Sequence, residues 1–167
     1  NKTLEKASKK ITSMATLKAR LGIQQGIDNW DAIIVTNGGH HGGSITWESV
    51  LIEKSTAPSG FRGHANRGDR ATATLLSLLH PLIYLTNDVG VTKPNGYDLY
   101  VASRSKYLIE GLKQSNPVWH SRLEKNRELW MAVYAAKRRG IVIHPELLLE
   151  DDRDFQELFK KIKENTQ

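Results

Sequence analysis

The spacing of hydrophobic positions changes near residue 31. Before this point, residues 2–21 carry an apolar side chain at every third or fourth position, with basic residues between them, which predicts a basic amphipathic helix. After it, apolar residues gather in short β-branched runs such as residues 32–36 (AIIVT), which predict strands. We therefore expect an amino-terminal helix and linker over residues 1–30, followed by one domain over residues 31–167.

The second region contains five predicted strands. They are expected at residues 32–36, 44–53, 61–65, 97–102 and 140–144. Between the first two lies the segment NGGHHGG, residues 37–43, whose glycines can adopt positive φ angles, so we predict that it forms the loop of a β-hairpin. The first three strands follow one another directly, whereas helical patterns precede each of the last two.

Helical periodicity predicts four helices between and after these strands. Pro81 lies within the first of them and is expected to kink or break it. Residues that favour the N-cap position, such as aspartate and serine, occur where several of these helices are predicted to begin. The helices are expected to start at Asp69, Ser103, residue 121, and Asp151 or Asp152.

The composition narrows the classes of partner and site. Lysine and arginine number 24 against 18 acidic residues, so the formal net charge is +6 and the chain favours polyanionic partners. There is no cysteine, which excludes disulfides and cysteine-ligated zinc. The longest apolar stretch, residues 75–85, is interrupted and too short to span a bilayer, so we expect an intracellular protein without membrane contact.

Four local patterns occur in an order that resembles the ribonuclease H family over about residues 31–163. Residues 35–39 (VTNGG) are similar to the family's strand ending in Thr-Asp-Gly, and residues 69–75 (DRATATL) to the start of its first helix. Residues 100–107 (YVASRSKY) are similar to its strand ending in Thr-Asp-Ser, and residues 126–143 to its helix with a core tryptophan before the last strand. The resemblance implies an α/β fold with a mixed five-stranded sheet flanked by helices, here with an additional amino-terminal helix.

The resemblance also implies where catalytic groups should stand. The family holds two Mg²⁺ ions with a cluster of carboxylates, because hard cations require anionic oxygen ligands. The corresponding positions in this chain fall on Asn37, Thr72, Arg104 and, as the last acidic group, Asp151, Asp152 or Asp154. His144 falls near the histidine of the family's mobile loop. We therefore expect no metal site, no cofactor and the loss of two-metal nuclease activity.

If the resemblance holds, basic residues surround the cleft that contains the carboxylates in the family. We predict that they bind nucleic acid, with RNA or an RNA/DNA hybrid favoured, and that the first glycine-rich turn lets its backbone approach phosphates closely. The predicted binding residues are Arg67, Arg70, Arg104, Lys106, Lys137, Arg138, Arg139, Asn37, Gly38 and Gly39.

Two other functions stay open at this point. The domain could be an active ribonuclease H-type endonuclease with an atypical site, in which Mg²⁺ or Mn²⁺ would act with histidines and the acidic cluster of residues 151–154. The histidines available to such a site are His40, His41, His64 and His144. Alternatively, the protein could be a non-catalytic interaction or assembly module, whose helix over residues 2–20 docks on a partner protein or on a second copy of the chain.

Overall fold

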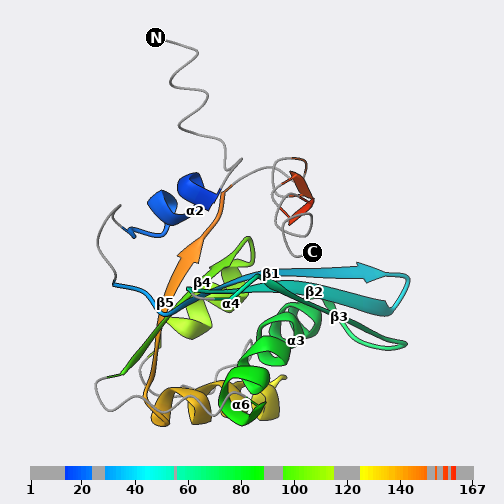
Figure 1. Ribbon diagram of the computed structural model, residues 1–167. Coiled ribbons are helices and arrows are strands. Elements are labelled where there is room, and N and C mark those ends of the chain that lie inside the picture. Colours follow the sequence, from blue (N-terminus) through cyan, green and yellow to red (C-terminus); the bar gives the residue numbers. More distant parts are fainter. Residues whose placement is uncertain are drawn as a thin grey trace.

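The computed structural model describes residues 14–23, 29–54, 56–88, 96–114, 125–149, 153, 156–157 and 159–160. A five-stranded sheet with the order β3-β2-β1-β4-β5 organises them (Figure 1). β2 pairs antiparallel with both β1 and β3, while β4 pairs parallel with β1 and β5 pairs parallel with β4. Their bounds are Ala32–His41 for β1, Ser44–Glu53 for β2, Ser59–Ala65 for β3, Tyr97–Ser103 for β4 and Ile141–Leu147 for β5. The predicted mixed five-stranded α/β fold is confirmed.

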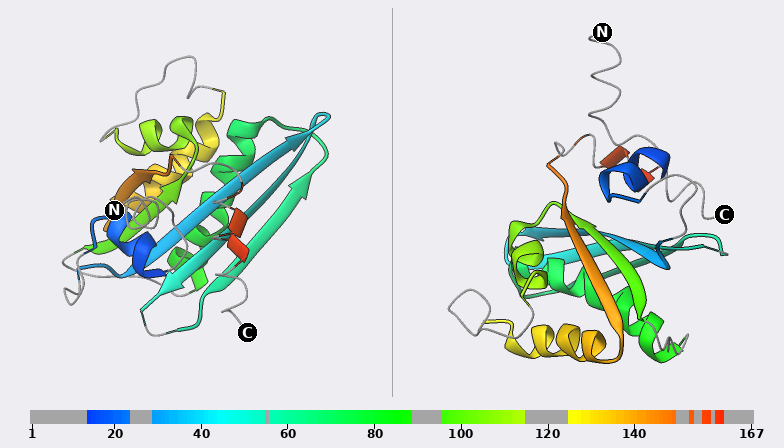
Figure 2. Two further views of the ribbon diagram at one scale, coloured as in Figure 1. Left: turned by 90° about the horizontal axis from the view of Figure 1, so that it is seen from above. Right: turned by 90° about the vertical axis from the view of Figure 1, so that its left-hand side faces the viewer.

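Three helices cover one face of this sheet (Figure 2). They are α3 (Arg70–Ile83), α4 (Lys106–Leu112) and α6 (Arg127–Arg138). Their apolar side chains pack against alternate residues of the strands, and this main core includes Ile34, Leu78 and Val101. Trp130 of α6 is fully buried and lies against the backbone of Gly111, so that a β-carbon at residue 111 would come within 2.2 Å of the indole ring. The helical layer is therefore closely packed at this crossing.

The opposite face of the sheet is covered by α2 (Met14–Arg20) and by part of the carboxy-terminal segment (Figure 1). Leu17, Leu21 and Phe159 are buried there together with Ile33 and Val35 of β1. The helix predicted for residues 2–21 is confirmed over the part that the structure describes. Leu17 and Leu21 are buried within the chain, and docking of the amino-terminal helix on a partner stays a prediction. The domain boundary after residue 30 stays a prediction.

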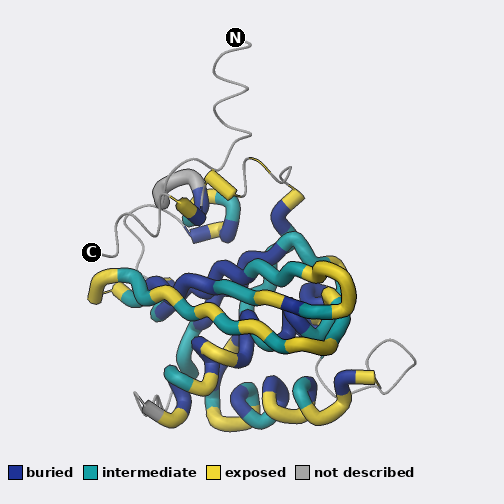
Figure 3. The backbone as a smooth tube through the Cα atoms, turned by 90° about the vertical axis from the view of Figure 1, so that its right-hand side faces the viewer, coloured by how far each residue is buried: buried dark blue, intermediate teal, exposed yellow. Residues whose placement is uncertain are grey.

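The hairpin loop predicted for residues 37–43 is wrong. β1 continues to His41 and remains paired with β2 over its whole length, so only Gly42 and Gly43 form the turn. Their φ angles of 57° and 92° suit the two-residue turn that matches the twist of a hairpin. Glycine-rich composition favours a loop, but β2 supplies a ladder partner for every residue of β1 up to the turn. The tip is exposed (Figure 3), and the Gly68 N–H donates to the Gly43 carbonyl at 3.1 Å.

Two helix predictions also need correction. Ser103 does not cap α4, because it stays in β4 as the ladder partner of Leu147, and Ser105 caps the helix instead. Pro81 does not end α3, which continues to Ile83 and into a π-helical turn, η1 (Tyr84–Asp88). Proline removes one helical hydrogen bond, but Pro81 is buried on the apolar side of α3, where packing holds the helix together.

The remaining boundaries are close to those predicted. Asp69 caps α3 as predicted, since its carboxylate accepts a hydrogen bond from the Thr72 N–H at 2.9 Å. α6 begins at Arg127 rather than at residue 121, and residues 121–124 lie outside the described ranges. The start predicted for the last helix, Asp151 or Asp152, also lies outside them. No helix in the described ranges is long and apolar enough to cross a membrane.

Candidate nucleic-acid interface

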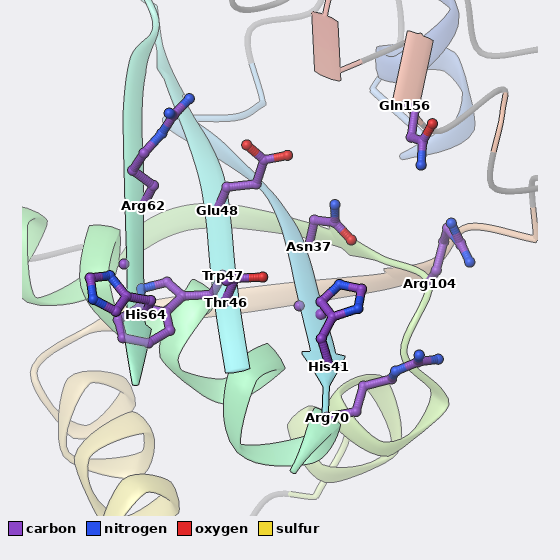
Figure 4. A pocket seen from close by; sticks show the side chains of 13 residues that line it. Asn37, His41, Thr46, Trp47, Glu48, Arg62, His64, Arg70, Arg104 and Gln156 are labelled. Atoms are coloured by element: carbon purple, nitrogen blue, oxygen red, sulfur yellow. The ribbon is translucent and has the colours of Figure 1, made fainter. Parts of the chain in front are cut away.

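A pocket of about 930 Å³ is lined by the second half of β1 and by residues of β2 and β3. The carboxy-terminal segment borders it (Figure 4). Most of the side chains that line it are polar or charged. The charged residues are Glu48, Arg62, Arg70 and Arg104, and the neutral polar or titratable ones are Asn37, His41, Thr46, His64 and Gln156. Such a lining suits a polar ligand rather than an apolar one.

The floor of the pocket follows from strand register. Asn37 on β1 is the ladder partner of Glu48 on β2, and Glu48 is the partner of Arg62 on β3. Because partners in a ladder point to the same face of a sheet, these three side chains form a row across it. The next row on the same face contains Thr46 and His64, which also line the pocket.

Arg104 and Arg70 approach from the other side of Asn37. β1 and β4 are parallel, and their last ladder pair is Val35 with Ala102, so Asn37 and Arg104 each lie two residues beyond this pair. Asn37 is still within β1, whereas Arg104 lies one residue past the end of β4, and both side chains line the pocket (Figure 4). Arg70 is the first residue of α3 and adds a guanidinium from a third direction. Arg62 is the third arginine of the described lining, which contains one carboxylate, so the lining carries a net positive charge and attracts anions.

Gly38 allows the strand beside this site to lie very close to α3. A β-carbon at residue 38 would stand 2.7 Å from the backbone nitrogen of Thr74 and 2.8 Å from its hydroxyl oxygen. Side chains larger than hydrogen do not fit at such distances. The absence of a side chain at residue 38 therefore sets the distance between β1 and the first turns of α3.

The fold of this chain is similar to that of solved structures, although its sequence matches no known family. No protein family and no curated protein matches the chain by sequence. Among solved structures, the chain is similar to the amino-terminal RNase H domain of rv2228c from Mycobacterium tuberculosis, with a TM-score of 0.58 and 18% identity over 82% of this chain and 99% of that one. The chain has a ribonuclease H-like fold.

Two further structures agree with this assignment. LC11-RNase H1, solved in complex with an RNA/DNA hybrid, has a TM-score of 0.55 at 15% identity, and the match covers 80% of this chain and 98% of that one. RNase H1 from the halophilic archaeon Halobacterium salinarum has a TM-score of 0.53 at 12% identity, with 78% and 98% covered. The ribonuclease H-like domain here therefore spans nearly the full length of each of these chains.

The ribonuclease H-like fold brings together two of the positions predicted to have lost a carboxylate. Asn37 and Arg104 both line the pocket, but Thr72 does not. The Thr72 hydroxyl lies 2.8 Å from Asp69 Oδ1 and 3.0 Å from the side-chain oxygen of Asn126. Thr74, two residues further along α3, is the residue that lies against Gly38. Both threonines are uncharged, and the loss of a carboxylate at this position stays a prediction. The last position, Asp154, lies outside the described ranges.

A hydrogen-bond network fixes the helix starts near the pocket. The Trp130 indole N–H donates to the Tyr107 hydroxyl at 2.8 Å, and the Asn126 amide lies 3.2 Å from the same hydroxyl. Through Asn126 the network reaches Thr72 and Asp69. The carboxylate of Asp69 also accepts from the ammonium of Lys125, which, with the Thr72 backbone N–H, lowers the Asp69 pKa to about 2. α3, α4 and α6 are thereby held in register.

Only two of the four histidines proposed for an atypical nuclease site line the pocket. His41 and His64 line the pocket, whereas His144 does not. His144 lies in β5 rather than in a loop, where its Nε2 is 2.9 Å from Asp98 Oδ1 and its ring stacks on Tyr100 at 4.5 Å between centroids. Among the described residues, no three histidine or acidic side chains gather to hold a metal ion. The acidic cluster at 151–154 lies largely outside that set, so the absence of a metal site stays a prediction.

The predicted basic residues divide into two groups. Arg70 and Arg104 line the pocket, together with the backbone of Gly38 and Gly39. The others, Arg67, Lys106, Lys137, Arg138 and Arg139, do not line it. Lys137 donates to the carbonyl oxygens of Leu112 and Gln114 at 3.3 and 3.0 Å, and burial lowers its pKa. It therefore joins α6 to the end of α4, and its role in binding nucleic acid stays a prediction.

Several lining residues, among them Glu48 and Gln156, are missing from the predicted site. The signal for Glu48 is present in the sequence, because extending the first strand by one ladder pair beyond residue 36 would place Glu48 opposite Asn37. Gln156 offers no such local signal, since its position depends on how the carboxy-terminal segment packs over the sheet.

Proposed function

We propose that this ribonuclease H-like domain binds a nucleic-acid strand through the pocket and does not cleave it. The observation that carries the proposal is the meeting of Arg62, Arg70 and Arg104 from three separate elements in one pocket, with a single carboxylate among the described lining residues. A guanidinium donates two parallel hydrogen bonds to a phosphate, and its charge does not vary with pH in the physiological range. Phosphates of a nucleic-acid backbone are the abundant polyanion that such a site suits.

The net charge of +6 supports the same partner, because it raises the rate at which a polyanion meets the protein. The similarity to LC11-RNase H1 adds an analogy, since that protein was solved with an RNA/DNA hybrid. At 15% identity this supports RNA or a hybrid as the first ligands to test, and nothing finer.

The described donor set does not fit a pair of divalent ions. A two-metal centre needs several anionic oxygens around two cations. Here Asn37 offers a neutral amide, Thr72 and Thr74 offer hydroxyls, and Arg104 adds a positive charge that would repel a cation nearby. Glu48 is the one carboxylate that the described lining contains. Binding of phosphate by the arginines would replace binding through Mg²⁺ or Mn²⁺.

Fluorescence anisotropy with labelled RNA, DNA and RNA/DNA hybrid of one sequence tests the binding. We expect Arg104→Ala and Arg70→Ala each to weaken binding by about 10- to 150-fold, as for a lost hydrogen bond to a charged group. Each should also reduce the slope of log K against log salt by about 1. Lys113→Ala is the matched control, because it removes an equal charge from an exposed residue that is neither in the pocket lining nor among the predicted binding residues. No binding to any of the three ligands at low salt would refute the proposal.

Cleavage is tested separately by incubating the labelled hybrid with Mg²⁺ or Mn²⁺. We expect no product above the level without metal. Metal-dependent cleavage that is lost in His41→Ala or His64→Ala would instead support the atypical nuclease. Cleavage that survives both changes but is lost in Asn37→Ala would show that two-metal chemistry has been retained.

A further inference from the structure

Two histidines of the pocket lining have no part in the proposed function as argued so far. His41 is the last residue of β1 and His64 belongs to β3, and both are exposed (Figure 4). Within the part of the chain that the structure describes, neither imidazole has a hydrogen bond or an ion pair. Both rings can therefore interact with a ligand that enters the pocket.

Strand register places these histidines around one glycine. On the pocket face, Gly39 is the ladder partner of Thr46, and Thr46 is the partner of His64. His41 follows Gly39 by two residues in the same strand, so its side chain lies on the same face. A β-carbon at residue 39 would stand 3.1 Å from Thr46 Oγ1 and 3.8 Å from His41 Nε2. The missing side chain thus leaves a recess in the pocket, bordered by a hydroxyl and an imidazole.

The groups around this recess suit a phosphate. The recess lies two residues along β1 from Asn37, which is roughly 7 Å, so a strand can place one phosphate near Asn37 and another in the recess. The Thr46 hydroxyl and an imidazole N–H both donate hydrogen bonds to anionic oxygens. A neutral imidazole offers one donor and no charge, whereas a protonated one offers two donors and a positive charge.

The charged groups of the pocket determine how affinity can vary with pH. Those of the described lining are Glu48 from β2, Arg62 from β3, Arg70 from α3 and Arg104 after β4. Carboxylates and guanidiniums ordinarily keep their charge between pH 6 and pH 8, whereas imidazole is the side chain that gains a charge in this range. A phosphate beside an imidazole favours its protonated form, and protonation by reciprocity favours the phosphate.

We infer that His41 and His64, together with the Thr46 hydroxyl, form a second phosphate contact that strengthens when the imidazoles are protonated. This inference rests on the proposed function. The arginines supply affinity that is constant with pH, and the two histidines add a part that increases as pH falls. Because RNA and DNA share the phosphate, the added part should be equal for both.

Fluorescence anisotropy at pH 8 and pH 6 tests this contact, with single-stranded RNA and DNA of one sequence that lack terminal phosphates. We expect the affinity of the wild-type protein to rise between pH 8 and pH 6 by about 3- to 10-fold for each histidine, where tenfold corresponds to one unit of proton linkage. The slope of log K against log salt should become steeper by about 0.7 for each histidine that neutralises a phosphate of a single strand.

His41→Gln and His64→Gln each remove one protonatable group at an exposed position, so both variants should fold. We expect each to lose about half of the pH effect on a logarithmic scale, and the double variant to show no pH effect on either affinity or salt slope. His80→Gln is the matched control, because it removes an exposed histidine that neither lines the pocket nor belongs to a predicted site, and it should keep the full effect.

A wild-type affinity that is equal at pH 8 and pH 6 would overturn the inference and leave the proposed function standing. A pH effect that persists in the double variant, or that is reduced as much in His80→Gln as in the pocket variants, would also overturn it, because the effect would then come from the general rise in net charge. If the wild-type protein binds neither strand at either pH in low salt, the proposed function itself fails.

Discussion

Replacing Gly38 by alanine tests the close approach of β1 to α3 that positions Asn37. The added β-carbon would lie 2.7 Å from Thr74 N, 2.8 Å from Thr74 Oγ1 and 3.0 Å from Ala73 C, whereas ordinary contacts begin near 3.4 Å. The strand and the helix would thus have to separate by about 0.7 Å, the difference between 3.4 and 2.7 Å. Two of the three clashing atoms belong to the helix backbone, which cannot move aside as a flexible side chain would.

Overpacking of this kind costs about 1–3 kcal/mol of the free energy of unfolding. For a domain of this size, each kcal/mol lowers Tm by roughly 2–4 °C. Urea unfolding followed by tryptophan fluorescence measures the loss. Gly60→Ala in β3 is the matched control, because its β-carbon would meet no atom within 4 Å, so we expect no loss of stability. Equal stability of Gly38→Ala and the wild-type protein would refute the packing described here, and so would an equal loss in the control.

Three further predictions concern stability. Tyr107→Phe leaves the indole N–H of the fully buried Trp130 without its acceptor, so we expect urea unfolding to show a loss of about 1–3 kcal/mol; a loss below about 0.5 kcal/mol would contradict the network. The ion pair with Lys125 lowers the Asp69 pKa from 3.8 to about 2. The ionised carboxylate therefore adds to the free energy of unfolding above pH 4, and this addition is lost as pH falls through 2. Unfolding curves measured over this pH range should show the wild-type protein losing its higher stability relative to Asp69→Asn. Burial raises the Tyr97 pKa from 10.0 to about 12, so stability should fall as pH rises from 10 to 12, by up to roughly 2–3 kcal/mol, and Tyr97→Phe should lack this fall in alkaline unfolding curves.

The elements with strong local signals could be predicted from the sequence. Residues 44–53 follow a strand-like alternating pattern that includes several β-branched residues, and β2 occupies the same range. Asp69 is followed by a helical apolar pattern and caps α3 as predicted. The residues at 37–41 carry no such signal. They join β1 only because β2 pairs with them, and a partner strand's contribution is not visible in local composition.

The same distinction applies to the site. Asn37 and Arg104 could be placed together because each follows the apolar run of a parallel strand, and neighbouring parallel strands end at the same edge. The position on α3 could not be settled, because residues 72 and 74 point in different directions around a helix and no local pattern decides between them. Glu48 requires the pairing of β1 with β2, which the glycine-rich composition concealed.

The buried residues on the sheet face covered by α2 limit where this chain can be shortened. Leu17, Leu21 and Ile23 are at most 6% exposed, and they cover a sheet face that also includes Ile33 and Val50. Burying one such side chain is worth about 1.5–3 kcal/mol, so the three together account for a large part of the 5–15 kcal/mol that usually separates a folded domain from its unfolded state. A fragment that starts at residue 31 would expose a contiguous apolar surface of the kind that causes aggregation. Hydrophobic periodicity marks a change of secondary structure at that residue, whereas burial shows that the segment before it contributes to the stability of the sheet.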